Sequence, residues 1–541
     1  MVGHPSLSTA VIGRYWHSLF ALVVAVLSGC AALPPGSGFP KSASSALAHP
    51  EETRLGRQFD NAGSDHGGNS GFRIIPVGAD GFLVRMQMIN AAERTIDLQY
   101  FIFHGDDTGR LLTGAVLHAA DRGVRVRILV DDGETDPGDE QLTALEAHPS
   151  VELRIFNPFA YRGHSTLLRA VEFTTNASRL DYRMHNKLLV VDNAIALIGG
   201  RNIGDQYFQI DPDSQFADDD VFAAGPIARR LSATFDEFWN SALSIPAEAL
   251  AGGKSSRAAL NEHREELKEE RQQSKDDGVD YVKRIASGQP FDQIVSGSLP
   301  LIWAHAQLVC DSPDKKKVEK GDMVGRLMHR SVAQAVASVH SELLMVTPYL
   351  IPGKEGMQLF KDLRQRNVRV RVLTNSLESS TGLPAQSGYM PYRRPLLEEG
   401  VELYEIRSLL GNARGSGQTA AISRYGNYSL HAKLFVFDRQ RLFIGSMNFD
   451  QRSMHLNTEI GLIIDSPELA QQVATRFEAM VQPANSYALQ LRASDTGGAP
   501  TLVWHTQEGS EIVDYDREPA RSGWQRFEAD LLSHVPLDRE L

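Results

Sequence analysis

Cysteine is nearly absent from this sequence, which has only Cys30 and Cys310 among its 541 residues. Two cysteines exclude a disulfide framework, so the chain must be stabilised by buried apolar surface. The chain is several times longer than a usual domain, and 42% of its residues are hydrophobic and 23% charged. This composition excludes a fibre or a disordered chain and predicts at least two well-buried cores.

A surplus of basic residues is also missing, because the formal net charge is -12. General nucleic-acid binding needs a basic surface that neutralises phosphates, so nucleic acid is not expected as a partner. Local basic residues can still serve a smaller anionic substrate.

The N-terminal apolar run, residues 18–29, is too short for a comfortable membrane span. Arg14 precedes this run and no acidic residue does, as in a secretory signal peptide. The run ends in the string LSGC, which resembles the lipobox of bacterial lipoproteins. The resemblance implies that residues 1–29 are removed and that Cys30 is lipid-modified. The string PPGSG shortly after Cys30 is typical of a flexible tether, which we place over residues 30–70. We therefore expect a lipid-anchored protein of the bacterial envelope that faces the periplasm; the alternative is an uncleaved hydrophobic anchor with an incidental cysteine.

An internal duplication fixes the expected architecture. The string VRVR recurs 244 residues apart and the string HxK recurs 246 residues apart, in the same order. Around them, apolar strands alternate with amphipathic helices, which predicts α/β lobes with parallel or mixed sheets. We predict a first lobe over residues 71–250, a charged linker over 251–295, a second lobe over 296–485 and a C-terminal appendage over 486–541. Within the linker, an exposed helix is favoured over a disordered connector.

The motif His-x-Lys-x-x-x-x-Asp occurs once in each copy, as His185, Lys187 and Asp192 and as His431, Lys433 and Asp438. Residues two apart in a strand share a face, so each histidine emerges beside its lysine. One copy alone is a weak signal, whereas two copies inside a duplication are a strong one. The two aspartates end their strands, so a turn-capping role is at least as well supported as a catalytic one.

An asparagine follows each histidine by 17 residues, Asn202 in the turn GGRN and Asn448 in the turn GSMN. Glycine-rich turns allow an oxyanion to approach backbone N–H groups closely. Lys187 and Lys433 supply positive charge, and the asparagines supply neutral amide donors. Together they can face a phosphoryl group whose negative charge grows in the transition state.

The two histidines can divide the chemistry at such a phosphoryl group. A neutral imidazole attacks phosphorus and forms a phosphohistidine, while a protonated imidazole gives its proton to the departing alkoxide. Each histidine then needs a carboxylate that fixes its tautomer. Glu459, 28 residues after His431, is the candidate in the second copy. In the first copy the equivalent residue is either Asp218 or Asp220.

The doubled motif with its trailing asparagine resembles the phospholipase D superfamily. The strings IDLQYFIFHGDDTGRLL, RMHNKLLVVD and LFIGSMNFDQRSMHLNTE are similar to bacterial cardiolipin synthases of the C type, and the similarity spans about residues 85–485. The resemblance implies two pseudosymmetric lobes, each a mixed sheet flanked by helices, an active site at their interface, and neither metal nor cofactor. It also implies His185 as nucleophile and His431 as acid and base, although the symmetry leaves the reverse assignment open.

The same resemblance implies membrane phospholipids as partners. A phosphatidyl group would move from one phospholipid to an alcohol, with phosphatidylglycerol as the first candidate substrate and phosphatidylethanolamine as a further one. A phospholipase that releases phosphatidic acid would use identical residues. A nuclease is a third possibility, which the acidic charge and the expected lipid anchor disfavour.

Overall fold

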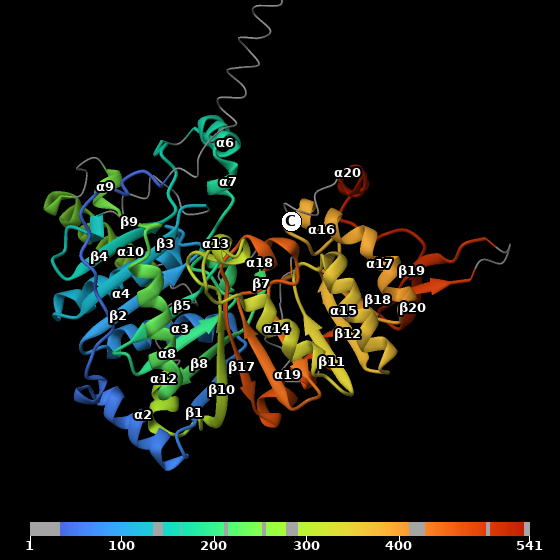
Figure 1. The fold of residues 1–541 in the computed structure, drawn as a ribbon, viewed down its shortest axis with the longest axis horizontal. Helices are drawn as coiled ribbons and strands as arrows, with labels where there is room; N and C mark the ends of the chain where they lie inside the picture. The colour runs from blue at the N-terminus through green and yellow to red at the C-terminus, as the bar shows by residue number, and fades with distance from the viewer. Residues whose placement is uncertain are drawn as a thin grey trace, which may run out of the picture.

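The computed structural model describes residues 33–133, 144–163, 165–209, 215–251, 256–276, 290–410, 428–493 and 498–534. The predicted signal peptide and Cys30 lie outside these residues. Figure 1 shows two α/β halves side by side, with strands fanning out from the centre. Of the helices in the described ranges, none has the length and apolar character needed to cross a membrane.

Within the described residues, 18 strands form a single sheet that runs through both halves. From its outer edge, the first half contributes β9 (Ser244–Pro246), β4 (Val151–Phe156), β3 (Arg125–Asp131), β2 (Thr95–Tyr100), β5 (Leu188–Val191), β6 (Ile195–Gly199), β8 (Asp220–Ala224) and β1 (Ser70–Ile75). The second half repeats this order with β18 (Ser486–Arg492), β13 (Glu402–Ile406), β12 (Arg369–Asn375), β11 (Glu342–Val346), β15 (Leu434–Phe437), β16 (Arg441–Gly445), β17 (Ile460–Asp465) and β10 (Ile302–Cys310).

The two halves meet where β1 and β10 pair antiparallel, with Gly71 opposite Trp303. In each half three neighbouring strands are parallel, β2–β3–β4 and β11–β12–β13, and the other pairings within this sheet are antiparallel. The predicted α/β class, with one mixed lobe used twice, is therefore confirmed. Because the pairing is continuous, the lobes form one sheet and not two separate ones.

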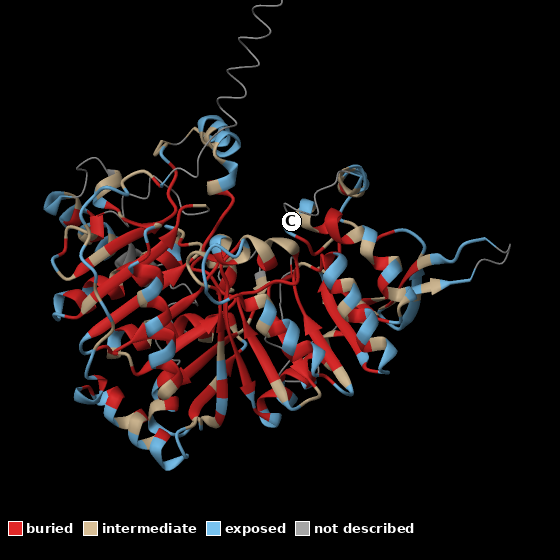
Figure 2. Cartoon of the chain, viewed as in Figure 1, coloured by how far each residue is buried: buried red, intermediate tan, exposed pale blue. Residues whose placement is uncertain are grey.

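Three apolar layers hold the helices to this sheet. One covers the outer face of the first lobe with α3 (Gly78–Ala91) and α4 (Asp107–Asp121), and another covers the second lobe with α14 (Met328–Ala337) and α15 (Gly353–Gln365). The central layer contains α8 (Pro226–Trp239), α19 (Pro467–Met480) and strands of both lobes. Figure 2 shows this interior as a nearly unbroken buried region. Separating the lobes would expose the central layer, so burial of apolar surface holds the seam between them closed.

The N-terminal segment corrects the prediction of a tether over residues 30–70. The helix α2 (Arg54–Asp65) buries Leu55 and Phe59, four residues apart on one face, in the core of the first lobe. Before it, the Lys41 ammonium donates to the Ser244 carbonyl (2.9 Å). Much of the expected tether is therefore packed against the first lobe, because apolar side chains at helical spacing dock there.

The C-terminal segment corrects the predicted boundary at residue 485. β18 pairs with β13, in the place that β9 takes beside β4 in the first lobe. β19 (Thr501–Glu508) and β20 (Glu511–Tyr515) then extend the sheet, and α20 (Gly523–Ser533) packs against α16 (Leu383–Tyr389). The segment 486–541 thus begins inside the second lobe, because unpaired edge groups on β13 recruit the next strand.

The charged segment between the lobes contains a helix, α10, over Arg257–Asp276. Arg264 forms an ion pair with Asp121 on α4 (2.7 Å), and Leu260 is buried in the first lobe. The helix therefore lies against the first lobe along α4.

Candidate active site

Short strand exchanges bring the two copies of the motif together at the seam. β7 (Gln215–Ala217) of the first lobe pairs in parallel with β14 (Tyr428–Leu430) of the second. Met184 of the first lobe also pairs in parallel with Thr458 of the second. The His431 N–H donates to the Ala217 carbonyl (2.8 Å), and the His185 N–H donates to the Thr458 carbonyl (2.9 Å). In both exchanges, the residue after the acceptor is a carboxylate.

Each histidine consequently contacts the carboxylate of the opposite lobe. His185 Nδ1 lies 2.9 Å from Glu459 Oε2, and His431 Nδ1 lies 2.6 Å from Asp218 Oδ2. All four side chains are buried. Sequence position suggested partners within each copy, and the structure exchanges them between copies. Spacing along the chain cannot show which segment crosses the seam, so this exchange is a tertiary feature.

Asp220, the alternative to Asp218, lies elsewhere. Its carboxylate accepts hydrogen bonds from Arg85 Nη1 (2.8 Å) and Arg201 Nη1 (3.0 Å), and both arginines are buried. Asp220 is the first residue of β8, and Asp218 lies two residues before it, outside the strand. The structure therefore places Asp218 at a histidine and Asp220 in a buried network that joins α3 to β8.

The two motif lysines lie against their own histidines. Lys187 Nζ donates to the His185 carbonyl (2.6 Å), and Lys433 Nζ donates to the His431 carbonyl and lies 2.9 Å from His431 Nδ1. Burial lowers the pKa of Lys187 well below its usual value and lowers the pKa of Lys433 to about 8. Both ammonium groups are thus confined in the site with incomplete compensation of their charge.

Burial also controls the protonation of the histidines. Together with the charges of Lys187 and Lys433, it lowers the pKa of His185 far below the usual value, and together with Lys433 it lowers the pKa of His431 to about 3. Both imidazoles are therefore neutral at neutral pH in the free protein. With Nδ1 held by a carboxylate, Nε2 is the ring nitrogen left for chemistry.

The two carboxylates differ in charge state. Burial raises the pKa of Glu459 to about 7. Burial also acts to raise the pKa of Asp218, but the charges of Lys433 and His431 outweigh it and hold that pKa below the usual value. Asp218 is therefore an anion beside His431, whereas Glu459 takes up a proton more readily than an ordinary glutamate does.

The two carboxylates also differ in their immediate contacts, because one copy has a serine where the other has a glycine. Ser446 Oγ donates to Glu459 Oε2 (2.5 Å), and Ser453 Oγ donates to Glu459 Oε1 (2.8 Å). Gly200 occupies the position equivalent to Ser446, and a Cβ there would overlap the Asp218 carboxylate. The turn GGRN thus leaves space for the Asp218 carboxylate, and the turn GSMN supplies a hydroxyl that donates to Glu459.

The two predicted asparagines lie in unequal surroundings. Asn202 accepts from the Ile102 N–H (3.2 Å) and donates to the Tyr207 hydroxyl (2.8 Å). Asn448 is also buried, but its Oδ1 has no hydrogen-bond partner within the described part of the chain. An unpaired buried amide oxygen is costly, so Asn448, unlike Asn202, has an acceptor left for a hydrogen-bond donor of a bound group.

The motif aspartates lie at the far ends of their strands from the histidines. Asp192 accepts from the N–H groups of Arg94 and Thr95 (2.8 Å each), and it turns from β5 into β6 with φ of 53°. Asp438 has φ of 52° and accepts the Ser341 N–H (2.7 Å) in the second lobe. Both carboxylates tie a hairpin to the start of β2 or β11, away from the site.

Sequence reasoning missed the groups that surround the pairs. The Phe101 ring lies 5.0 Å from the His185 ring, and the Phe216 ring stacks on His431 at 5.2 Å. Asp311, which is paired with Lys315 (3.0 Å), accepts the Glu459 N–H (2.9 Å). In the sequence, these residues are marked only by lying in or next to apolar strands. Many residues with a purely structural role have the same position. In the described ranges, no three His, Cys, Asp or Glu side chains are grouped so that they could hold a metal ion.

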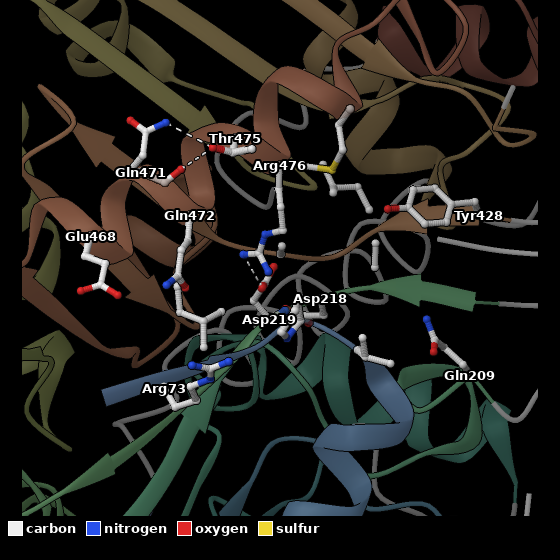
Figure 3. Close-up of a pocket in the computed structure, with 17 residues that line it drawn as sticks. Arg73, Gln209, Asp218, Asp219, Tyr428, Glu468, Gln471, Gln472, Thr475 and Arg476 are labelled. Atoms are coloured by element: carbon white, nitrogen blue, oxygen red, sulfur yellow. Dashed lines mark hydrogen bonds and ion pairs between the residues drawn. The ribbon is translucent and has the colours of Figure 1, made fainter. Parts of the chain in front are cut away.

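A cavity of about 690 Å³, which Asp218 helps to line, adjoins the site (Figure 3). It lies between β1 and α19, and neither histidine lines it. Arg476 of α19 reaches across it to Asp219, with Nη2 and Oδ1 2.7 Å apart. This ion pair joins the two lobes directly behind the His431–Asp218 pair.

Comparison with known proteins identifies the family to which the chain belongs. The family model "Cardiolipin synthase, PLD-like domain" matches residues 86–239 and 332–481. Two paired lobes of this kind define an enzyme of the phospholipase D type. The chain belongs to the family of cardiolipin synthases with phospholipase D-like domains.

Individual relatives have the following similarity. Cardiolipin synthase C of Escherichia coli (strain K12) is 34% identical over 88% of this chain and 97% of its own length. Cardiolipin synthase A of Pseudomonas fluorescens (strain Pf-5) is 24% identical over 78% of this chain and 70% of its own length. The crystal structure of phosphatidylserine synthase from Haemophilus influenzae Rd KW20 is 12% identical, covers 80% of this chain and 91% of its own, and has a TM-score of 0.49.

We predict that Gly200→Ala lowers kcat on a chromogenic phosphodiester by on the order of 100-fold, because the added methyl displaces Asp218 from His431. The measurement compares kcat and thermal unfolding with those of Gly38→Ala, where the same methyl meets nothing within 4 Å. Full activity of a folded Gly200→Ala protein would contradict the proposed importance of this contact.

We also predict that kcat/KM for the same phosphodiester falls as the pH rises above about 8. A lysine is charged below its pKa, and the pKa of Lys433 is about 8, so its positive charge is lost there and not near pH 10. The exposed Lys361 on α15 supplies a control, since Lys361→Ala leaves the profile unchanged. A rate that stays constant up to pH 10 would contradict this assignment.

Proposed function

We propose that this protein transfers a phosphatidyl group between phospholipids through a covalent phosphohistidine. The observation that carries the proposal is the pair of crossed contacts, His185 with Glu459 and His431 with Asp218, each buried beside a lysine. Two oriented imidazoles and two ammonium groups at one seam supply a nucleophile, a proton donor and charge for a phosphodiester.

The unequal carboxylates favour His185 as the nucleophile. Its partner Glu459 shares its charge with two serine hydroxyls, and its pKa is raised to about 7, so the pair keeps His185 neutral. The partner of His431 is the ionised Asp218, which stabilises an imidazolium. A general acid needs that support, and a nucleophile needs a free lone pair.

In the first half-reaction, His185 Nε2 attacks phosphorus and the bond from phosphorus to the leaving alkoxide oxygen breaks. A bound phosphodiester anion favours protonation of His431, which then gives its Nε2 proton to that oxygen. In the second half-reaction, neutral His431 takes the proton of the acceptor hydroxyl, whose oxygen attacks phosphorus while the bond to His185 breaks. Lys187 and Lys433 stabilise the charge on the phosphoryl oxygens in both steps.

We propose phosphatidylglycerol as donor and acceptor, so that cardiolipin is the product, with phosphatidylethanolamine as a further donor. Similarity to cardiolipin synthase C of Escherichia coli along nearly its whole length supports this choice. Water as acceptor would give phosphatidic acid with the same residues.

Product analysis tests the transferase against the hydrolase. The protein is incubated with phosphatidylglycerol, with and without phosphatidylethanolamine, and the lipids are identified by mass. We expect cardiolipin, and we expect His185→Ala and His431→Ala each to lower the rate by at least about 1,000-fold. Phosphatidic acid as sole product would refute the synthase proposal.

Trapping separates the roles of the histidines. After mixing with headgroup-labelled and phosphorus-labelled lipid, His431→Ala should retain a phosphoenzyme that His185→Ala does not form, because the second step lacks its base. Label on His185→Ala alone would reverse the assignment.

We further propose that Cys30 is lipid-modified and holds the protein at the periplasmic face of the cell envelope. The string LSGC after a short apolar run supports this proposal. A palmitate analogue fed to cells should label the wild type and leave Cys30→Ala unlabelled, with Cys310→Ala as the matched control. Equal labelling of wild type and Cys30→Ala would refute the modification.

A further inference from the structure

Two short helices carry much of the exposed apolar surface of the described chain. They are α6 (Thr166–Thr175) in the first lobe and α20 (Gly523–Ser533) in the second. Together they hold seven of the thirteen exposed large hydrophobic side chains found in the described residues: Leu167, Leu168, Val171, Phe173, Trp524, Phe527 and Leu531. Such concentration on 21 residues marks a binding surface, since scattered exposed apolar residues are normal and clustered ones are not.

The helix α6 has the reverse of the usual amphipathic arrangement. Its Arg169 donates to the Asp132 carbonyl, and its Glu172 accepts from the Ala160 N–H (2.7 Å), so its charged side chains face the protein. Leu167 is 71% exposed, and no residue of the helix is buried. A surface helix of a water-exposed protein normally buries its apolar face.

The helix α20 likewise exposes its large apolar side chains, although its small Ala529 is buried. Gln525 donates to the Leu377 carbonyl and Arg526 to the Glu518 carbonyl (2.8 Å each), so polar side chains attach it to the protein. Trp524, Phe527 and Leu531 have the i, i+3, i+7 spacing of one helical face and are more than half exposed. The Trp524 and Phe527 rings contact each other, with centroids 5.4 Å apart.

Both helices sit over equivalent strand ends next to the active site. α6 is attached to Asp132, just after β3, and Asp131 accepts the N–H of Met184, which precedes His185 (2.8 Å). α20 is attached to Leu377, just after β12, whose Asn375 contacts Leu430, which precedes His431. Figure 1 shows α6 and α20 at the same edge of the molecule, on either side of its centre.

We propose that α6 and α20 form a membrane-docking face that seats the protein on a phospholipid bilayer with the active site toward the lipid. This inference rests on the proposed function, because a phosphatidyl donor lies in a bilayer. Aromatic and aliphatic side chains on short in-plane helices insert at the boundary between headgroups and acyl chains. The exposed Lys320 lies beside α13 (Lys315–Glu319), whose Lys316 donates to a carbonyl of α7 (Ala177–Leu180) next to α6, and Lys320 complements lipid phosphates.

The reporter of docking is the natural Trp524. The full chain, in a Cys30→Ala background without acylation, is mixed with vesicles of phosphatidylcholine and phosphatidylglycerol brominated on the acyl chains. We expect quenching of tryptophan fluorescence that Trp524→Phe removes, because bromine quenches only nearby rings. Quenching that is equal in both proteins would overturn the proposal.

Substitutions then test whether docking serves catalysis. We expect Leu167→Ser/Val171→Ser and Phe527→Ser/Leu531→Ser each to lower the rate on vesicles at least about tenfold, and both to leave the rate on short-chain, detergent-dispersed lipid unchanged. Ile512→Ser on β20, which also removes an exposed apolar side chain, is the matched control and should change neither rate.

The outcomes separate this inference from the proposed function. Undiminished vesicle rates in the serine variants overturn the docking face and leave the chemistry intact. Trp524 quenching without any turnover of either lipid form supports docking and refutes the proposed transferase. Protein that elutes as a dimer, and becomes monomeric in the serine variants without vesicle quenching, would assign the face to a second copy and overturn the proposal.

Discussion

The crossed contact between each histidine and the carboxylate of the opposite lobe is the constraint on which the site depends. His185 contacts Glu459 and His431 contacts Asp218, so neither lobe by itself contains a histidine together with its carboxylate partner. Buried polar groups are tolerated only where partners satisfy them. The shared apolar layer of α8 and α19 supplies the enclosure that makes those partners necessary, and the pairs in turn fix how the lobes meet.

Duplication made two nearly equal halves, and small side chains then made them unequal. Ser446 gives Glu459 a hydroxyl, where Gly200 leaves room for Asp218. Burial nevertheless raises the pKa of Glu459 to about 7, whereas the charges of Lys433 and His431 hold the pKa of Asp218 below its usual value. A symmetric scaffold thereby provides two environments, which a nucleophile and a general acid require.

The candidate active site and the two exposed helices, α6 and α20, are held by the same strand ends. The ends of β3 and β12 contact the segments that carry the histidines, and the same ends hold α6 and α20. On α6 and α20, polar side chains face the protein and large apolar side chains face outward. This arrangement suits helices that contact a lipid surface and not only water. The chain's net charge of -12 makes apolar contact a more important source of membrane affinity than overall charge.

The sequence by itself determined the duplicated α/β lobes and the two histidines with their lysines and asparagines, because strand periodicity and repeated spacing are local properties. It also limited the first-lobe acid to Asp218 or Asp220. Only the tertiary structure decided that Asp218 contacts His431 while Glu459 contacts His185, because strand exchange across the seam leaves no mark on spacing. Likewise, the helical repeat in α2 and the edge pairing of β18 bind segments that composition alone suggested were a tether and an appendage.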